Sequence, residues 1–282
     1  MFERRRFIAG LAAGSACMLF PVFSTPVFAQ NGVESAWERI QRTKTIRMGA
    51  ITGAAPYYHK DLRSREWEGF MIDFAHDLSS KLGVEPVFSE VNWGTYVMEL
   101  QSNRLDIFLG VNPTPERREA LDITNPLFNN AFVLMAREGF APQTWEEINR
   151  PEFRLAVDMG SSHDQFIQQV CPNATILRLN SAADASMAVV SGRADAQVLA
   201  IVLALRLRSQ NPNFKNLVLP HPVQTTTTNI GLRKEDDKRL LAYVNDWIAE
   251  IRASGFVQQT VMANLEKFSG VTATDLPPEV SF

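Results

Sequence analysis

The chain has 282 residues, with 28 Lys and Arg against 31 Asp and Glu, and a formal net charge of −3 at pH 7. This length can bury a large core, either as one large domain or as two smaller lobes. A mildly acidic chain lacks the positive charge that nucleic acid or an anionic membrane surface attracts, which excludes both as partners.

The amino terminus indicates export. Residues 4–6 are three arginines, residues 8–20 are an apolar stretch, and small residues up to Ala29 offer a cleavage site. This pattern predicts a signal peptide over residues 1–29 that is cleaved from the mature protein, and the arginines followed by Phe and Ile are typical of twin-arginine export. We therefore expect the protein in the periplasm.

A lipoprotein signal at Cys17 is the alternative, although Gly14 stands where such signals usually have Leu. Cleavage after Ala29 would leave 253 residues with a net charge of −5 and Cys171 as the one cysteine. No intramolecular disulfide is then expected, even in an oxidising compartment.

The elements that follow alternate between strand and helix, which predicts an α/β fold whose mostly parallel sheets are flanked by helices. Apolar spacing and turn residues delimit them. In the first half of the chain, strands are expected over residues 45–50, 84–91 and 105–111, and helices over residues 70–82 and 96–100. In the second half, strands are expected over residues 154–158, 174–179 and within 194–202, and helices over residues 163–170, 182–190 and 203–207.

Two short segments resemble each other. Residues 100–107 (LQSNRLDI) and 189–196 (VVSGRADA) share the pattern apolar-x-Ser-(Asn/Gly)-Arg-x-Asp-apolar, at the same place in the two halves. Helix-turn-strand junctions can look alike by necessity. The shared position nevertheless favours two lobes of the same topology.

Two extended segments should connect these lobes and form a hinge. Thr225 to Thr228 are β-branched and suit an extended crossing strand. We expect crossings at residues 132–137 and 223–232. They divide the chain into a first lobe of residues 45–135 and 229–268 and a second lobe of residues 136–228. Two helices, over residues 236–251 and then through residue 265, precede a flexible tail of residues 269–282.

The segment from Leu105 to Arg117 carries the strongest functional signal. Its apolar run ends in the loop that begins at Asn112, and ligands of open α/β sheets bind at the carboxyl ends of strands. An Arg at that position can bind a carboxylate with two hydrogen bonds. The alternative is a surface Arg in the charged helix start of residues 116–119.

Other chemistry is weakly represented. The histidines are scattered without a metal-ligand spacing, and no phosphate-binding loop, dinucleotide fingerprint or nucleophile elbow occurs. We therefore expect no metal, no cofactor and no catalytic residue.

The chain resembles the periplasmic solute-binding proteins of polar amino-acid ABC transporters, the bacterial extracellular solute-binding protein family 3. The resemblance runs from about Thr45 to Lys267 and implies a two-lobed clamp of the Venus-flytrap type that closes over a small carboxylate ligand. It also implies an ABC permease in the inner membrane as partner, and we expect a monomer without enzymatic activity. The motifs that carry it are Ile46-Arg-Met-Gly49, Gly69-Phe-Met-Ile-Asp73, Leu82-Gly83, Trp93, Leu105-Asp106, Thr114-Pro-Glu-Arg117, Asn125-Pro126, Gly192-Arg-Ala-Asp195 and Gly231.

The resemblance assigns roles to particular residues. In the family, the Arg matching Arg117 and the residue matching Asn112 bind the ligand's carboxylate, and the aromatic matching Trp93 stacks on the ligand. The turn matching residues 160–162 adds donors at a helix start, where free N–H groups attract an anion. The expected ligand contacts are Arg117, Asn112, Trp93, Gly110, Ser161, Ser162, His163, Tyr57 and Ala200.

One departure from the family pattern concerns the ligand's amine. The family's amine-binding carboxylate lies five residues after the residue matching Asp195, where this chain has Ala200. A buried ammonium without an anionic partner costs several kcal/mol. The ligand is therefore hypothesised to be a small organic carboxylate that need not be an ordinary α-amino acid, in a fairly apolar pocket. Alternatively the register slips near Ala200, or Asp158 or Asp164 supplies the anion.

Two other functions remain open. A dehydratase of the cyclohexadienyl dehydratase type on the same scaffold would need a general acid, for which His163 is the one good proton carrier near the cleft. We favour reading His163 as a solvated first-turn residue. The third possibility is a periplasmic accessory or sensor protein that uses the clamp fold to contact another protein.

Overall fold

The computed structural model describes residues 34–211, 214, 216–276 and 282. The predicted signal peptide lies outside the described residues. Residues 34–282 cluster into one unit. Within the described part, no helix is both long and apolar enough to cross a membrane.

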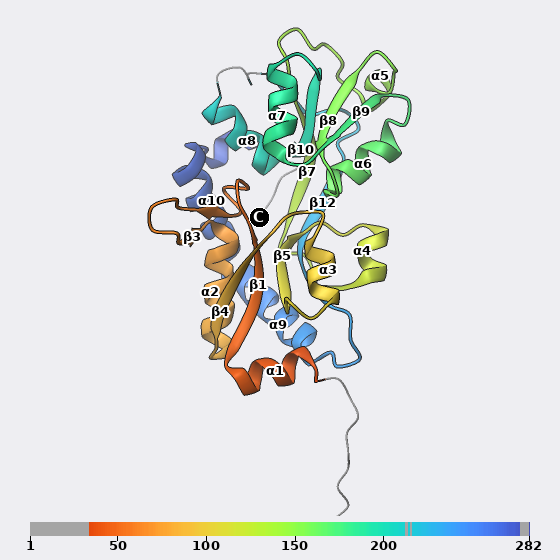
Figure 1. Ribbon diagram of the computed structural model, residues 1–282. Coiled ribbons are helices and arrows are strands. Elements are labelled where there is room, and N and C mark those ends of the chain that lie inside the picture. The colour runs from red at the N-terminus through yellow and green to blue at the C-terminus, as the bar shows by residue number, and fades with distance from the viewer. Residues whose placement is uncertain (1–33, 212–213, 215, 277–281) are drawn as a thin grey trace, which may run out of the picture. The chain divides into compact units, whose positions relative to one another are not determined.

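One ten-stranded sheet organises this unit (Figure 1). Eight of its strands follow the order β4-β1-β5-β12-β7-β10-β8-β9, and in addition β11 pairs with β7 and β6 pairs with β12. Strand β1 pairs in parallel with β4 and β5, and β8 pairs in parallel with β10 and β9. The antiparallel strands β12 and β7 lie between these parallel groups, and helices flank the sheet, which confirms the predicted fold class. The strands are β1 (Thr45–Ile51), β4 (Glu85–Val91), β5 (Ile107–Val111), β6 (Leu121–Ile123), β7 (Phe128–Ala136), β8 (Arg154–Asp158), β9 (Thr175–Leu179), β10 (Ala196–Ala200), β11 (Asn216–Val218) and β12 (Thr225–Arg233), and β2 (His59–Lys60) and β3 (Trp67–Glu68) form a separate hairpin.

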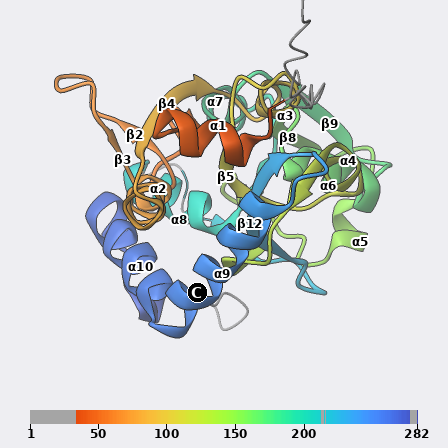
Figure 2. The same ribbon diagram turned by 90° about the horizontal axis from the view of Figure 1, so that it is seen from below.

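The helices follow the predicted order. Helix α2 has the predicted bounds because Gly83, at φ +68°, ends it and donates its N–H to the carbonyls of Ser79 and Ser80. In Figure 2, α10 lies beside α2 and α9, which it contacts. The helices are α1 (Ala36–Thr43), α2 (Phe70–Leu82), α3 (Tyr96–Gln101), α4 (Pro115–Ala120), α5 (Trp145–Ile148), α6 (Ser162–Val170), α7 (Ala182–Val190), α8 (Ile201–Gln210), α9 (Arg239–Ala253) and α10 (Phe256–Ser269), with a 3-10 turn at Ala273–Asp275.

Helix α10 is longer than predicted. It continues past Leu265 to Ser269 and ends at Gly270, which adopts φ +63°. The next residue, Val271, is buried against the core. The first part of the predicted tail therefore packs on the protein.

Strands β7 and β12 cross between the two halves of the sheet. The first half of β7 pairs with β12, and its second half pairs with β10 and β11. Strand β12 pairs with β7 over residues 225–228 and, after an irregularity at Asn229, with β5. The predicted crossings therefore exist as two adjacent antiparallel strands, while the lobe boundaries remain a prediction.

The two similar sequence segments form the same structure twice. Asp106, before β5, accepts hydrogen bonds from the backbone N–H of Arg47 in β1 (2.7 Å) and from its guanidinium (2.7 Å). Asp195, before β10, accepts the same two bonds from Arg154 in β8 (2.9 Å each). In each half an Asp at the start of one strand therefore holds an Arg of the neighbouring parallel strand, which supports a repeated topology.

The ion pairs of Asp195 should make the free energy of unfolding depend on pH. Burial alone would raise its pKa, but hydrogen bonds from Arg154 and Arg137 outweigh burial and hold the pKa at about 2. Since the folded pKa lies below the unfolded one, the stabilisation is present above about pH 4 and is lost towards about pH 2. Asp195→Asn should lower the free energy of unfolding, measured with urea, by an amount that depends on pH. We expect this loss to be about 2 kcal/mol larger at pH 5 than at pH 2. A pH-independent difference would contradict this ion pair.

Candidate functional site

Arg117 is held at the start of α4, next to the end of β5. Thr114 caps the helix with its hydroxyl, and Pro115 occupies the first helical position, where no N–H is needed. This start turns the Arg117 side chain inward, so that the residue is only 4 % exposed. Its guanidinium lies over the ring of Tyr96, 5.3 Å from the ring centre.

The guanidinium of Arg117 bonds to backbone carbonyls of both halves of the sheet. Nη1 donates to the carbonyl of Asn112 (2.9 Å), and Nη2 donates to the carbonyl of Gly160 after β8 (3.0 Å). No carboxylate of the described residues forms an ion pair with it. Burial accordingly lowers the pKa of Arg117, although the charges of Tyr96 and Asp158 oppose that shift.

Asn112 connects the same two halves through its side chain. Its Nδ2 donates to the carbonyl of Thr227 in β12 (2.8 Å), and its Oδ1 accepts from the hydroxyl of Ser162 at the start of α6 (3.0 Å). The structure therefore brings Arg117, Asn112 and Ser162 together, while their role as ligand contacts stays a prediction.

The start of α6 presents free backbone donors beside this group. The hydroxyl of Ser161 caps the helix by accepting from the N–H of Asp164 (3.0 Å). Among the described residues, the N–H groups of Ser162 and His163 have no acceptor. Such N–H groups and the positive end of the helix favour an anion.

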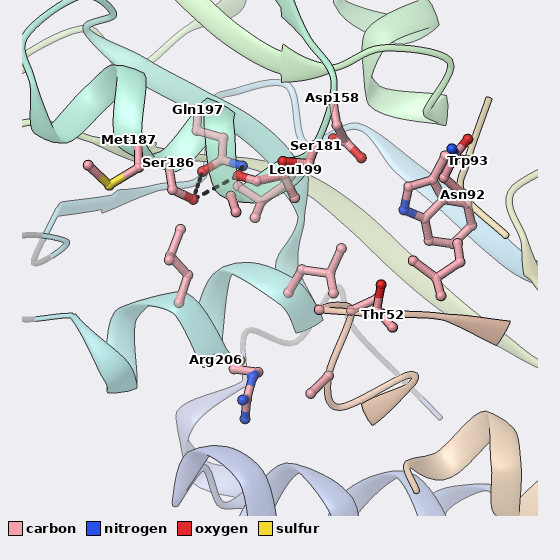
Figure 3. Close-up of a pocket in the computed structure, with 18 of the residues that line it drawn as sticks. Thr52, Asn92, Trp93, Asp158, Ser181, Ser186, Met187, Gln197, Leu199 and Arg206 are labelled. Atoms are coloured by element: carbon pink, nitrogen blue, oxygen red, sulfur yellow. Dashed lines mark hydrogen bonds between the residues drawn. The ribbon is translucent and has the colours of Figure 1, made fainter. Parts of the chain in front are cut away.

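A cavity of about 470 Å³ is lined by Asp158, which contacts His163 at the start of α6 (Figure 3). Trp93 and Asn92, after β4, and Asp158, at the end of β8, line it from opposite parts of the sheet. Residues of α7 and α8 form much of its wall, and the ends of β1 and β10 contribute to it as well. Trp93 is half-buried and packs edge-on against Phe108, with ring centres 5.8 Å apart.

His163 is not the solvated residue that we favoured from the sequence. It is 4 % exposed, and its Nε2 contacts Oδ1 of Asp158, itself 3 % exposed. The first turn of α6 is turned toward the end of β8, so the position that suggested solvent exposure is buried. Burial would raise the pKa of Asp158, but the charge and hydrogen bond of His163 outweigh it and keep that pKa below its ordinary value.

The two acids that could replace the missing carboxylate at Ala200 differ in their partners. Asp164 accepts from the guanidinium of Arg178 (2.8 Å), from Gln168 (2.8 Å) and from the N–H of Gly160 (2.8 Å). Asp158 instead lines the cavity. Ala200 ends β10 and is 4 % exposed, and it does not line the cavity.

Two further predicted contacts lie in the core of the first half. Tyr57 is buried, its ring packs on Phe70 (centres 4.5 Å apart), and its hydroxyl accepts from Asn130 (2.7 Å). Gly110 has φ +89°, and a Cβ there would lie 3.5–3.9 Å from Met71, Tyr57 and Trp93. Neither residue lines the cavity, so as ligand contacts both stay predictions.

Sequence reasoning missed the wall of the cavity that α7 and α8 form. Gln197 of β10 is buried there and is held by Ser186 (2.7 Å) and by the carbonyl of Ala182 (3.0 Å). Both helices were predicted, but their spacing of apolar residues does not tell which face meets a cavity. Among the described residues, no group of three or more His, Cys, Asp or Glu could hold a metal ion.

Comparison with known proteins identifies this chain as a solute-binding protein and gives its family. Residues 46–265 match the model of the bacterial extracellular solute-binding proteins, family 3. The chain therefore belongs to this family.

Similar proteins include binding proteins and an enzyme. The L-cystine-binding protein TcyJ of Escherichia coli is 23 % identical over 260 residues, covering 92 % of this chain and 94 % of the relative. The cyclohexadienyl dehydratase of Pseudomonas aeruginosa is 24 % identical over 240 residues, covering 83 % and 87 %.

Solved structures have the same fold. The ancestral amino acid-binding protein AncCDT-1, described as a precursor of cyclohexadienyl dehydratase, has a TM-score of 0.73 and 27 % identity, covering 83 % of this chain and all of that one. A solute receptor for L-cysteine from Neisseria gonorrhoeae has a TM-score of 0.77 at 21 % identity, covering 88 % of this chain and all of that one, and so supports the fold alone.

Proposed function

We propose that this protein is the exported binding component of an ABC importer and holds a small amino acid or related organic carboxylate at Arg117. The observation that carries the proposal is a buried guanidinium that has no carboxylate partner among the described residues. A buried charge without a counter-charge is costly, and a ligand carboxylate would supply that counter-charge with two hydrogen bonds. Asn112, Ser162 and the start of α6 would complete its coordination.

Asp158 is proposed as the partner of the ligand's ammonium group. It lines the cavity beside Trp93, its lowered pKa keeps it ionised at neutral pH, and its charge interacts with that of Arg117. A guanidinium and a carboxylate in one site match the two charges of an α-amino acid. The sequence left open whether Asp158 or Asp164 replaces the acid that is missing at Ala200. These observations favour Asp158.

Calorimetry on matched ligands tests this assignment. We expect L-phenylalanine and L-alanine to bind at least about tenfold more tightly than 3-phenylpropanoate and propanoate, because only the amino acids engage Asp158. Asp158→Asn should abolish that preference, whereas Asp184→Asn, on the exposed start of α7, should keep it. Equal affinity for both members of each pair in the wild type would contradict the role of Asp158. Mass spectrometry of molecules retained during purification would identify the natural ligand.

A dehydratase on this scaffold is the second candidate. The buried contact of His163 with Asp158 at the cavity wall favours it, since such a pair can transfer a proton. The similarity to a cyclohexadienyl dehydratase adds support. Incubation with prephenate or arogenate decides between the two: a binding protein leaves both unchanged, and an enzyme forms an aromatic product that His163→Ala abolishes.

A further inference from the structure

Half of the large, exposed apolar side chains of the described residues lie at one cavity. Large hydrophobic residues with high exposure are few in the described part of the chain, and they comprise Leu62, Val87, Met98, Met159, Met187 and Val190. Half of them line the cavity: Met159 (49 % exposed), Met187 (58 %) and Val190 (41 %). Exposed apolar side chains that cluster around one hollow are typical of a ligand site.

Further apolar side chains of the helices and strands line the cavity wall. Leu203 and Leu207, one turn apart on α8, line it together with Leu199 of β10. Ile51 and Val91 line it from the ends of β1 and β4. Its volume of about 470 Å³ falls in the range of sites that enclose a whole small molecule.

The polar groups of α7 and β10 in this wall already have partners. The side-chain oxygen of Gln197 accepts from Ser186 (2.7 Å), and its amide nitrogen donates to the carbonyl of Ala182 (3.0 Å) (Figure 3). These groups are therefore not free to hold a charged ligand group.

Charged residues are rare among the described residues that line the cavity, and they comprise Asp158 and Arg206. Arg206 donates to the carbonyl of Phe268 at the end of α10 (2.7 Å) and lies over the ring of Phe268, 5.5 Å from its centre. Figure 3 shows the Arg206 side chain directed away from the cavity, towards α10. Away from Asp158, the cavity therefore presents an uncharged lining.

The cavity shares Asp158 with the proposed head-group site and extends away from it. Trp93 and Asp158 line it, whereas Arg117, Asn112 and Ser162 do not. We infer that the cavity between α7, α8 and the ends of β1 and β4 receives an uncharged, largely apolar side chain of the ligand, whose charged head is held at Arg117 and Asp158. This inference rests on the proposed function for the head group only.

A homologous series of amino acids measures the cavity's preference. From L-alanine through L-2-aminobutyrate and L-norvaline to L-norleucine, we expect affinity to rise about fourfold for each added methylene, as burial of an apolar group does. L-Lysine adds one ammonium to the chain of L-norleucine and should bind at least about tenfold more weakly, because Asp158 is the one carboxylate among the described residues that line the cavity. A flat series, or lysine binding as tightly as norleucine, would overturn the inference.

Two double variants of matched exposure locate the effect. Met187→Gln with Val190→Gln changes the cavity, and Met98→Gln with Val87→Gln changes residues of similar exposure (57 % and 45 %) elsewhere. The first should lower norleucine affinity about tenfold and leave alanine affinity within about twofold, while the second changes neither. Equal effects of the two double variants would contradict the inference.

A neutral fluorescent probe separates this inference from the proposed head-group site. N-phenyl-1-naphthylamine has no carboxylate, so its binding should survive Arg117→Ala and be lost in the Met187 and Val190 double variant. If no amino acid binds but the probe behaves in this way, the head-group proposal fails and the apolar cavity stands. If the probe binds both double variants equally, the cavity assignment fails.

Discussion

Arg117→Ala is expected to weaken binding of the tightest amino acid of the calorimetric panel by about 100-fold, or about 3 kcal/mol. Under the proposed function, the variant would remove the guanidinium hydrogen bonds to the ligand carboxylate and the positive charge that compensates it in a buried site. Asn112, Ser162 and the start of α6 would remain, so residual binding should persist. Calorimetry at neutral pH measures the loss.

The neighbouring residue supplies the control for this experiment. Arg118 is exposed on the same helix, and Arg118→Ala removes the same charge without reaching the site. Its affinity should stay within about twofold of the wild type because exposed charges are screened. Unfolding measured without added ligand shows whether Arg117→Ala remains folded. An affinity of folded Arg117→Ala within threefold of the wild type would overturn the proposed function.

Asp106→Asn should lower the free energy of unfolding by about 3–5 kcal/mol, the usual cost of breaking a buried ion pair. Its carboxylate is fully buried and accepts from the guanidinium groups of Arg47 and Arg39, which are only 26 % and 12 % exposed. The amide of Asn would direct its own N–H groups at these donors. Urea unfolding at pH 7 measures the loss.

The matching position in the other half provides a graded comparison. Asp195→Asn should cost less, because Arg154 and Arg137 are 41 % and 48 % exposed and water can replace the lost acceptor. Asp246→Asn, an exposed position on α9, should cost less than about 0.5 kcal/mol. If Asp106→Asn is no more destabilising than Asp246→Asn, the buried network does not stabilise the fold.

Local signals were sufficient to predict most of the elements. The helix over residues 70–82 ends at Gly83 because glycine adopts the left-handed conformation easily. A glycine after an apolar helical pattern therefore predicts the end of a helix from the sequence alone. The strand over residues 154–158 is likewise a short apolar run between polar residues. Helix α10 was predicted too short because Leu265 is its last strongly apolar core residue, while Gly270 ends it.

Tertiary contacts decided what the sequence could not. The burial of His163 depends on Asp158 at the end of a neighbouring strand, and nothing in the first turn of a helix predicts that contact. Likewise, the cavity face of α7 follows from how that helix packs on β8 and β10. The ligand contacts assigned through family resemblance stay predictions until binding is measured.

Under the proposed function, the bond between Arg117 and the carbonyl of Gly160 holds the guanidinium in place before a ligand arrives. Each terminal guanidinium nitrogen carries two N–H groups, so a ligand carboxylate would bind beside the backbone carbonyls and need not displace them. Little side-chain freedom of Arg117 would then be lost on binding, and preorganisation of this kind increases affinity. A substitution that moves the carbonyl of Gly160 would therefore loosen the guanidinium in the free protein and weaken binding without removing a contact to the ligand.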